Sequence, residues 1–257
     1  MQKNTVLFKK GNSVCTLIIT RPKVMNALNT DTLVRLQDAF CQIRSDRNIR
    51  VVILEGAEGN FSSGADLYDF SKMNGAPEVL ELMKGIGKLI RSMRELPQPI
   101  ICKVRGVAVG GGANLALAGD FVLASHNARF CEVFVNIGVV VDCGGTYFLP
   151  RLVGMAKARE LAFLGEMIDG KTAHSIGLIY KSVPDRNLNK EVDSLARILS
   201  QKSISAIALI KEGLEKSLDM SLSEILEWEA SHQAVVAQTR EHKEALRQFF
   251  KQRGKRR

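Results

Sequence analysis

A run of glycines is the segment of this 257-residue sequence best suited to chemistry. An apolar stretch at 100–104 leads through Gly106 into VAVGGGANLALAGD at 107–120, where good helix formers follow Gly110, Gly111 and Gly112. The order predicts a strand, a glycine turn and a helix. Such a turn lets backbone N–H groups approach a ligand at the positive end of the helix dipole. It could bind a phosphate, a carboxylate or an oxyanion, or be a tight turn without a ligand.

Two common phosphate-binding motifs do not fit this turn. A P-loop needs Lys and then Ser or Thr after its last glycine, whereas Ala113 and Asn114 follow Gly112. A dinucleotide-binding fingerprint needs a third glycine where this sequence has Leu115. Other residues must therefore decide which ligand the turn serves.

Asp142 is a second candidate for chemistry. It follows three valines and precedes Cys143, Gly144 and Gly145. Burial without a compensating partner disfavours an ionised carboxyl and raises its pKa, which suits proton transfer. An aspartate beside glycines is equally typical of a plain turn residue. The local sequence leaves both interpretations open.

Alternating strand and helix patterns must position these groups. We expect a hairpin from 6–8 and 14–20, helices at about 29–45 and 78–94, and short strands at 51–54, 121–124 and 128–131. Glycine-bearing loops cover 56–67 and 138–145. The alternation predicts an α/β fold.

From residue 156 the pattern becomes helical. We expect helices at 156–163, 172–175, 188–199, 205–218 and 221–251, interrupted by a strand at 178–183. The predicted organisation is an α/β core over residues 1–187, followed by a C-terminal helical region with a basic tail over 188–257.

The composition, 46% hydrophobic and 25% charged, is that of a globular protein. The net charge of +9 is partly local, because the last seven residues hold five bases and no acid, which is typical of a solvated tail. Five widely spaced cysteines indicate reduced thiols and no disulfide framework or metal site. The first residues lack the apolar h-region of a signal peptide, and no segment approaches the roughly 18 to 20 apolar residues of a membrane span. We therefore expect a cytoplasmic protein without metal, membrane or nucleic-acid partners.

Three further motifs carry a resemblance. FSSGADL stands at 61–67, RPKVMNAL at 21–28, and GGT with LPRLVG at 144–154. With the glycine turn, these motifs resemble the crotonase (enoyl-CoA hydratase/isomerase) superfamily over nearly the whole chain. The resemblance implies an α/β crotonase-like core of stacked ββα turns in a spiral, with a helical C-terminal trimerisation region. It also implies acyl-CoA thioesters as substrates, coenzyme A only as part of the substrate, no separate cofactor, and homotrimers or hexamers built as dimers of trimers.

The same resemblance implies roles for individual residues. Backbone N–H groups of Ala65 and Gly111 would form an oxyanion hole for the thioester oxygen. Phe249 lies where the family often completes a neighbouring subunit's CoA site. The implied substrate- and CoA-binding residues are Lys23, Val24, Met25, Ala27, Ala65, Asp66, Leu67, Tyr68, Gly111, Asn114 and Phe134.

The chain departs from the family's hydratases at two positions. Those enzymes activate water with two glutamates, where this sequence has Asn114 and Phe134, and neither side chain can act as a general base. Glu132 is either a displaced acid or an ordinary surface or core-edge glutamate. Asn114 together with Asp142 is similar to the branch typified by 1,2-epoxyphenylacetyl-CoA isomerase, in which the matching aspartate is the acid/base.

These observations predict an enoyl-CoA isomerase in which Asp142 moves a proton and the oxyanion hole holds the enolate. Three alternatives stay open: a hydratase-like lyase, a hydrolase or dehalogenase in which Asp142 is the nucleophile, and a CoA- or RNA-binding family member with little catalysis.

Overall fold

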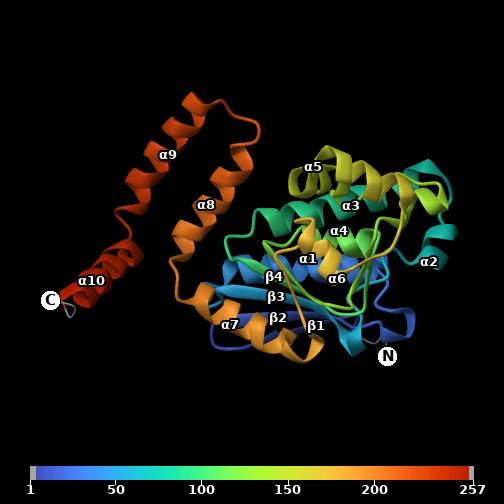
Figure 1. Ribbon diagram of the computed structural model, residues 1–257, viewed down its shortest axis with the longest axis horizontal. Helices are drawn as coiled ribbons and strands as arrows, with labels where there is room; N and C mark the ends of the chain where they lie inside the picture. Colours follow the sequence, from blue (N-terminus) through green and yellow to red (C-terminus); the bar gives the residue numbers. More distant parts are fainter. Residues whose placement is uncertain (1–3, 255–257) are drawn as a thin grey trace.

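The computed structural model describes residues 4–254, with side chains as far as Lys251. Most of the basic tail predicted from the sequence, Arg253 to Arg257, lies outside the described side chains. Figure 1 shows strands packed between helices, with the last helices extending away from this body. The α/β fold class predicted from the sequence is confirmed.

The strands form a six-stranded sheet in the order β1-β2-β3-β4-β6-β9 and a three-stranded sheet in the order β5-β7-β8. Their bounds are β1 Val6–Lys10, β2 Val14–Ile19, β3 Val51–Gly56, β4 Ile100–Val104, β5 Val107–Val109, β6 Phe121–Ser125, β7 Arg129–Cys131, β8 Ile168–Asp169 and β9 Lys181–Val183. The β1–β2 hairpin and the β7–β8 pair are antiparallel, whereas every other pairing is parallel.

Helices cover both faces of the larger sheet (Figure 1). The α-helices are α1 Thr30–Ser45, α2 Leu67–Ser71, α3 Ala76–Arg94, α4 Gly111–Leu117, α5 Gly145–Leu164, α6 Gly170–Ser175, α7 Leu188–Ser200, α8 Ile204–Lys216, α9 Leu222–Val236 and α10 Arg240–Gly254. Because strands β3 and β4 are buried on both faces, their apolar runs show no alternation.

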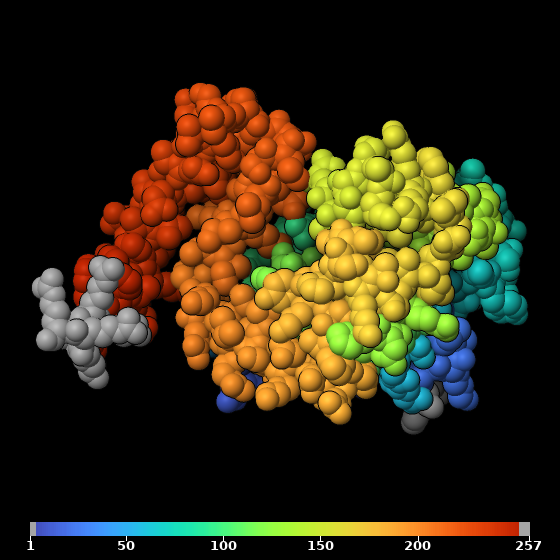
Figure 2. Space-filling model, viewed as in Figure 1, coloured from blue at the N-terminus to red at the C-terminus, as the bar shows by residue number. Residues whose placement is uncertain are grey.

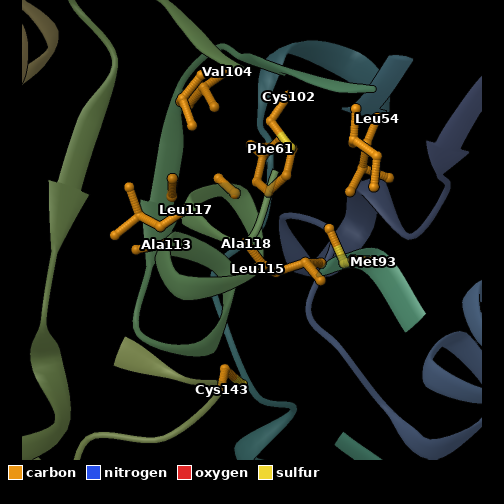
Figure 3. Packing of buried hydrophobic residues seen from close by; sticks show 14 of the residues in the cluster. Leu54, Phe61, Met93, Cys102, Val104, Ala113, Leu115, Leu117, Ala118 and Cys143 are labelled. Carbon is orange, nitrogen blue, oxygen red and sulfur yellow. The ribbon is translucent and has the colours of Figure 1, made fainter. Parts of the chain in front are cut away.

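Every residue of α4 is buried, so this short helix lies in the centre of the protein. Figure 3 shows its apolar side chains packed near Phe61 and Cys102, with Cys143 on a loop at the other side of the helix in this view. The N-terminal end of α4, where the glycine turn lies, is therefore held rigidly by the core.

Three predicted boundaries were wrong. The helix expected from residue 156 begins at Gly145. Its first turns were missed because they contain Pro150 and lead into a kink at Gly154, two residues that usually end a helix. The helix expected at 221–251 is two helices, since the Thr239 hydroxyl caps a new start by accepting the N–H of His242. The strand expected at 178–183 covers only Lys181–Val183.

The C-terminal helices α8, α9 and α10 form an extended arm, orange to red in Figure 2. Large apolar side chains stay exposed on it, among them Leu214, Leu218 and Leu222. Exposed apolar surface of this kind is typical of contacts between protein chains. The division at residue 187 stays a prediction, and no helix within 4–254 is long and apolar enough to cross a membrane.

Candidate active site

The first loop of the site is the FSSGADL segment, which lies against the segment at 23–28. The N–H of Ser63 donates to the carbonyl of Met25 at 2.9 Å, and that of Leu28 donates to the carbonyl of Gly64 at 2.7 Å. The N–H of Asp66 returns a bond to Leu28 at 2.9 Å. These backbone bonds bring together two segments to which the family resemblance assigns the same substrate.

Two residues that we did not single out from the sequence anchor these loops. The buried Asn26 carboxamide donates to the carbonyls of Ala57 and Asn60 at 2.9 and 2.7 Å. Arg21 forms an ion pair with Asp66 at 2.7 Å. Burial tends to raise the pKa of Asp66, but the Arg21 guanidinium and backbone N–H groups outweigh this effect and lower it. The backbone of Asn26 is left-handed, with a φ of 58°, a conformation that asparagine tolerates well but that the sequence alone does not reveal.

The glycine turn forms the second half of the site. Gly110 has a φ of 51° and the N–H of Gly110 donates to Cys131 of β7 at 2.8 Å, so the turn is tied to the smaller sheet. Gly111 is the first residue of α4. Gly64 has a φ of 89°, and a Cβ there would lie 2.6 Å from the Val109 carbonyl and 3.5 Å from the Gly111 nitrogen. The two glycine-bearing segments therefore touch only because neither carries a side chain there.

Both predicted oxyanion donors are available in this arrangement. Within residues 4–254 no hydrogen bond is found for the N–H of Ala65 or that of Gly111. Ala65 is exposed, and Gly111 lies at the N-terminal end of α4, where N–H groups have no partner within the helix. Such an arrangement could stabilise negative charge that develops on a ligand oxygen.

Asp142 lies beside this turn, on the loop between Gly138 and α5. A Cβ on Gly111 would be 3.7 Å from Asp142 Oδ1 and 3.1 Å from Cys143 Sγ. Asp142 Oδ1 is buried and accepts no hydrogen bond from the described part of the chain. Burial raises the pKa of the Asp142 carboxyl, although the neighbouring Cys143 thiol partly opposes this by hydrogen bonding. Burial and the Asp142 charge raise the pKa of Cys143, so this thiol is a poor nucleophile.

Asn114 and Glu132 complete the buried polar cluster. Asn114 is fully buried, and its Nδ2 donates to Glu132 Oε2 at 3.2 Å and to the Asp142 carbonyl at 3.0 Å. Glu132 is only 5% exposed. A surface position for Glu132 is therefore wrong, whereas a core-edge glutamate and a displaced acid are both compatible with this burial. Phe134 is also buried and lies against Gly110, 3.6 Å from a Cβ placed there, so this wall of the site is apolar.

The pKa of Glu132 predicts a pH-dependent stability. Burial raises this pKa from 4.5 to about 7; the Asn114 hydrogen bond opposes the rise and the Asp142 charge adds to it. Between these values the unfolded chain loses the proton first, so the free energy of unfolding is expected to fall as pH rises from 4.5 to about 7. At about 1.4 kcal/mol per pKa unit, the loss is roughly 3 kcal/mol.

Urea unfolding of the wild type and Glu132→Gln near both ends of this pH range checks the prediction. The variant cannot ionise at this position, so its stability should change with pH by roughly 3 kcal/mol less than that of the wild type. Glu166→Gln, at an exposed position, is the matched control and should keep the wild-type dependence. Equal pH dependence in the wild type and Glu132→Gln would show that the pKa of Glu132 is unshifted.

The remaining predicted site residues surround these loops. Lys23, Val24, Met25, Leu67 and Tyr68 are exposed, whereas Ala27 is buried. The exposed positions leave apolar surface beside Ala65 for a ligand to cover. Within residues 4–254 no group of three or more histidine, cysteine or acidic residues is arranged to hold a metal ion.

The fold and the site define an α/β protein in which two glycine-bearing turns converge beside the half-buried carboxyl group of Asp142. The model of the enoyl-CoA hydratase/isomerase family matches residues 9–256. The chain belongs to this family, as the sequence motifs predicted.

Two relatives and one solved structure give the degree of similarity. The 1,2-epoxyphenylacetyl-CoA isomerase of Escherichia coli is 34% identical over 251 residues, 96% of each chain. The short-chain-enoyl-CoA hydratase of Clostridium acetobutylicum is 34% identical over 257 residues, 98% of this chain and 97% of the relative. The crystal structure of an enoyl-CoA hydratase from Bacillus anthracis matches with a TM-score of 0.92 at 30% identity, covering 96% of each chain.

Proposed function

We propose that the protein is an enoyl-CoA isomerase that shifts a double bond by proton transfer through Asp142. The observation that carries the proposal is the half-buried Asp142 carboxyl, whose buried Oδ1 lies beside the Gly111 turn. Asn114 and Phe134 occupy the positions at which the family resemblance implies the water-activating glutamates of hydratases. A carboxyl beside an oxyanion hole, without either of those two glutamates, favours moving a proton over adding water.

In this mechanism Asp142 takes a proton from a carbon near the thioester. The C–H electron pair forms a new carbon–carbon double bond conjugated with the thioester, the C=O π electrons move to the oxygen, and the N–H groups of Ala65 and Gly111 stabilise the enolate. The protonated carboxyl then returns the proton to a different carbon, which moves the double bond and restores the Asp142 carboxylate. Each such N–H donor is worth roughly 2.7 to 4 kcal/mol to reactions of this kind.

The remaining expectations follow from the same proposal. Coenzyme A enters only as part of the substrate, bound along Lys23, Val24, Met25, Asp66 and Leu67, and no metal or redox cofactor takes part. The exposed apolar side chains of α8 to α10 support self-association as a trimer or a hexamer. We also propose that the protein works in the cytoplasm.

The test is an assay of the purified protein on 2-enoyl-, 3-enoyl- and ring-acyl-CoA thioesters in deuterated water. An isomerase interconverts 2-enoyl and 3-enoyl isomers and incorporates deuterium into the substrate. Formation of 3-hydroxyacyl-CoA as the main product would assign a hydratase. Release of free CoA or halide, with a covalent acyl- or aryl-enzyme detected by intact-protein mass, would assign Asp142 as a nucleophile.

A fourth outcome is turnover of none of these thioesters. Retained CoA or RNA binding would then favour a binding protein. Nucleic-acid binding that weakens steeply with salt and disappears when the basic tail is removed would identify RNA as the ligand.

A further inference from the structure

Glu132 is a buried carboxyl that the proton-transfer scheme leaves without a task. It directly follows β7 and begins the short helix η3 at Val133–Ile137, and only 5% of its surface is exposed. A buried carboxyl normally needs a hydrogen-bond partner, and here Asn114 supplies it at 3.2 Å. The position of Glu132 is therefore set by Asn114.

The neighbours of Asn114 decide how its carboxamide is oriented. Both acceptors around Nδ2 are oxygens, Glu132 Oε2 and the Asp142 carbonyl, so the amino group must point toward them. A Cβ on Gly145 would lie 2.3 Å from Nδ2, so only glycine leaves room for this arrangement. Glu132, Asn114 and the main chain of Asp142 consequently form one continuous hydrogen-bonded chain.

We propose that Glu132 is a positioning residue for Asp142. It holds the Asn114 carboxamide against the Asp142 main chain, and its own charge adjusts how strongly the Asp142 carboxylate attracts a proton. The inference rests on the proposed function, in which Asp142 carries the transferred proton.

The electrostatic surroundings of Glu132 contain acids and thiols. Among the described residues, the titratable groups that interact with it are Asp142, Cys131 and Cys143, and no cation is among them. Burial raises the pKa of both thiols, so they are neutral near pH 7. The two carboxyls therefore oppose each other's ionisation, as carboxyls that share one site do.

This coupling predicts that ionisation of Glu132 makes Asp142 a stronger base. The pKa of Glu132, about 7, means that Glu132 becomes charged on passing through neutral pH. A charged Glu132 raises the proton affinity of Asp142, which makes Asp142 a stronger base. If proton removal limits turnover, kcat should rise by roughly 3- to 10-fold across this range, because proton transfer follows base strength.

The kinetic experiment measures kcat and KM across neutral pH for the wild type, Glu132→Gln and the exposed control Glu166→Gln. Glutamine keeps an acceptor for Asn114 but cannot ionise. The rise in kcat should be present in the wild type and the control and absent from Glu132→Gln, with KM changed less than about twofold. A wild-type kcat without this rise, or the same rise in Glu132→Gln, would overturn the positioning role.

A second measurement is independent of turnover. Infrared spectroscopy should detect a protonated carboxyl that ionises near pH 7 in the wild type and is missing from Glu132→Gln. In Asp142→Asn the midpoint of this ionisation should fall, because the opposing charge is gone. A midpoint unchanged in Asp142→Asn overturns the inference. A shifted midpoint in a protein without isomerase activity supports the Glu132–Asp142 coupling and overturns only the proposed function.

Discussion

Replacing Asp142 by asparagine is expected to lower kcat for double-bond isomerisation by about 10²- to 10⁴-fold, the range by which positioned acid–base groups act. Asparagine preserves the size of the side chain but cannot take up the proton. The N–H groups of Ala65 and Gly111 are unaffected, so KM should change little. Deuterium exchange from solvent into the substrate should fall in parallel with turnover, because both need the same C–H bond to break.

The matched control is Asp38→Asn, an exposed position on α1, which should keep wild-type kcat. Circular dichroism and thermal unfolding of both variants separate loss of chemistry from loss of structure. Undiminished isomerisation and exchange in Asp142→Asn would contradict the role of Asp142 as the base.

Replacing Lys211 by methionine is expected to lower the free energy of unfolding by about 3 to 5 kcal/mol, the usual cost of removing one partner of a buried ion pair. Lys211 on α8 is 9% exposed, and its Nζ donates to Asp120 Oδ2 at 2.9 Å. It also donates to the carbonyls of Met93 and Leu96, at the C-terminal end of α3, at 3.1 and 3.2 Å. Methionine keeps an apolar side chain of similar length but removes the ammonium group, so these three acceptors lose their charged hydrogen-bond donor.

The control for this change is Lys216→Met on the same helix. Lys216 is exposed, and its ion pair with Glu212 spans 3.7 Å, so its loss should cost less than about 1 kcal/mol. Urea unfolding compares the two variants at one pH. A loss in Lys211→Met no larger than that in Lys216→Met would show that the buried pair adds nothing to stability.

Lys211 belongs to a network that ties α8 to the elements of the site. On the same helix Glu215 accepts the Tyr147 hydroxyl at 3.0 Å and pairs with Arg94 of α3. Tyr147 is on α5, directly after the Asp142 loop. The arm of C-terminal helices is therefore anchored to the helix that follows the proposed base.

Elements defined by local patterns were predicted well from the sequence. The helix expected near 29–45 is α1, where the Asn29 side chain accepts the N–H of Thr32 and the apolar residues Leu33, Leu36 and Phe40 are buried. Caps and periodicity lie within a few residues of one another, so the sequence contains them directly. The helix break at 237–239 was missed because residues 221–251 contain no glycine or proline, and only the Thr239 cap marks the break.

The residues of the candidate site likewise divide into those recognisable from local motifs and those that depend on distant contacts. Its glycine turns and the Ser63–Gly64–Ala65 segment were recognisable because each is a short motif, whereas Asp142 was singled out as the base only through the family resemblance. Glu132 stayed undecided between a displaced acid and an ordinary surface or core-edge glutamate, since its surroundings come from elsewhere in the chain. Asn114 follows β5 and Glu132 follows β7. The two side chains come within hydrogen-bond distance because these strands pair in parallel, with Val109 opposite Cys131.

By itself, therefore, the sequence determined the fold class, the family and the chemical groups available. These groups are two turns of small residues and the Asp142 carboxyl, and the two glutamates of hydratases are replaced by other residues. The tertiary structure alone decided that Asp142 lies against Gly111, and that Glu132 and Asp142 are joined by one asparagine. The physical reason is that burial and proximity depend on contacts between segments distant in sequence, and these two quantities set the proton affinity of a carboxyl.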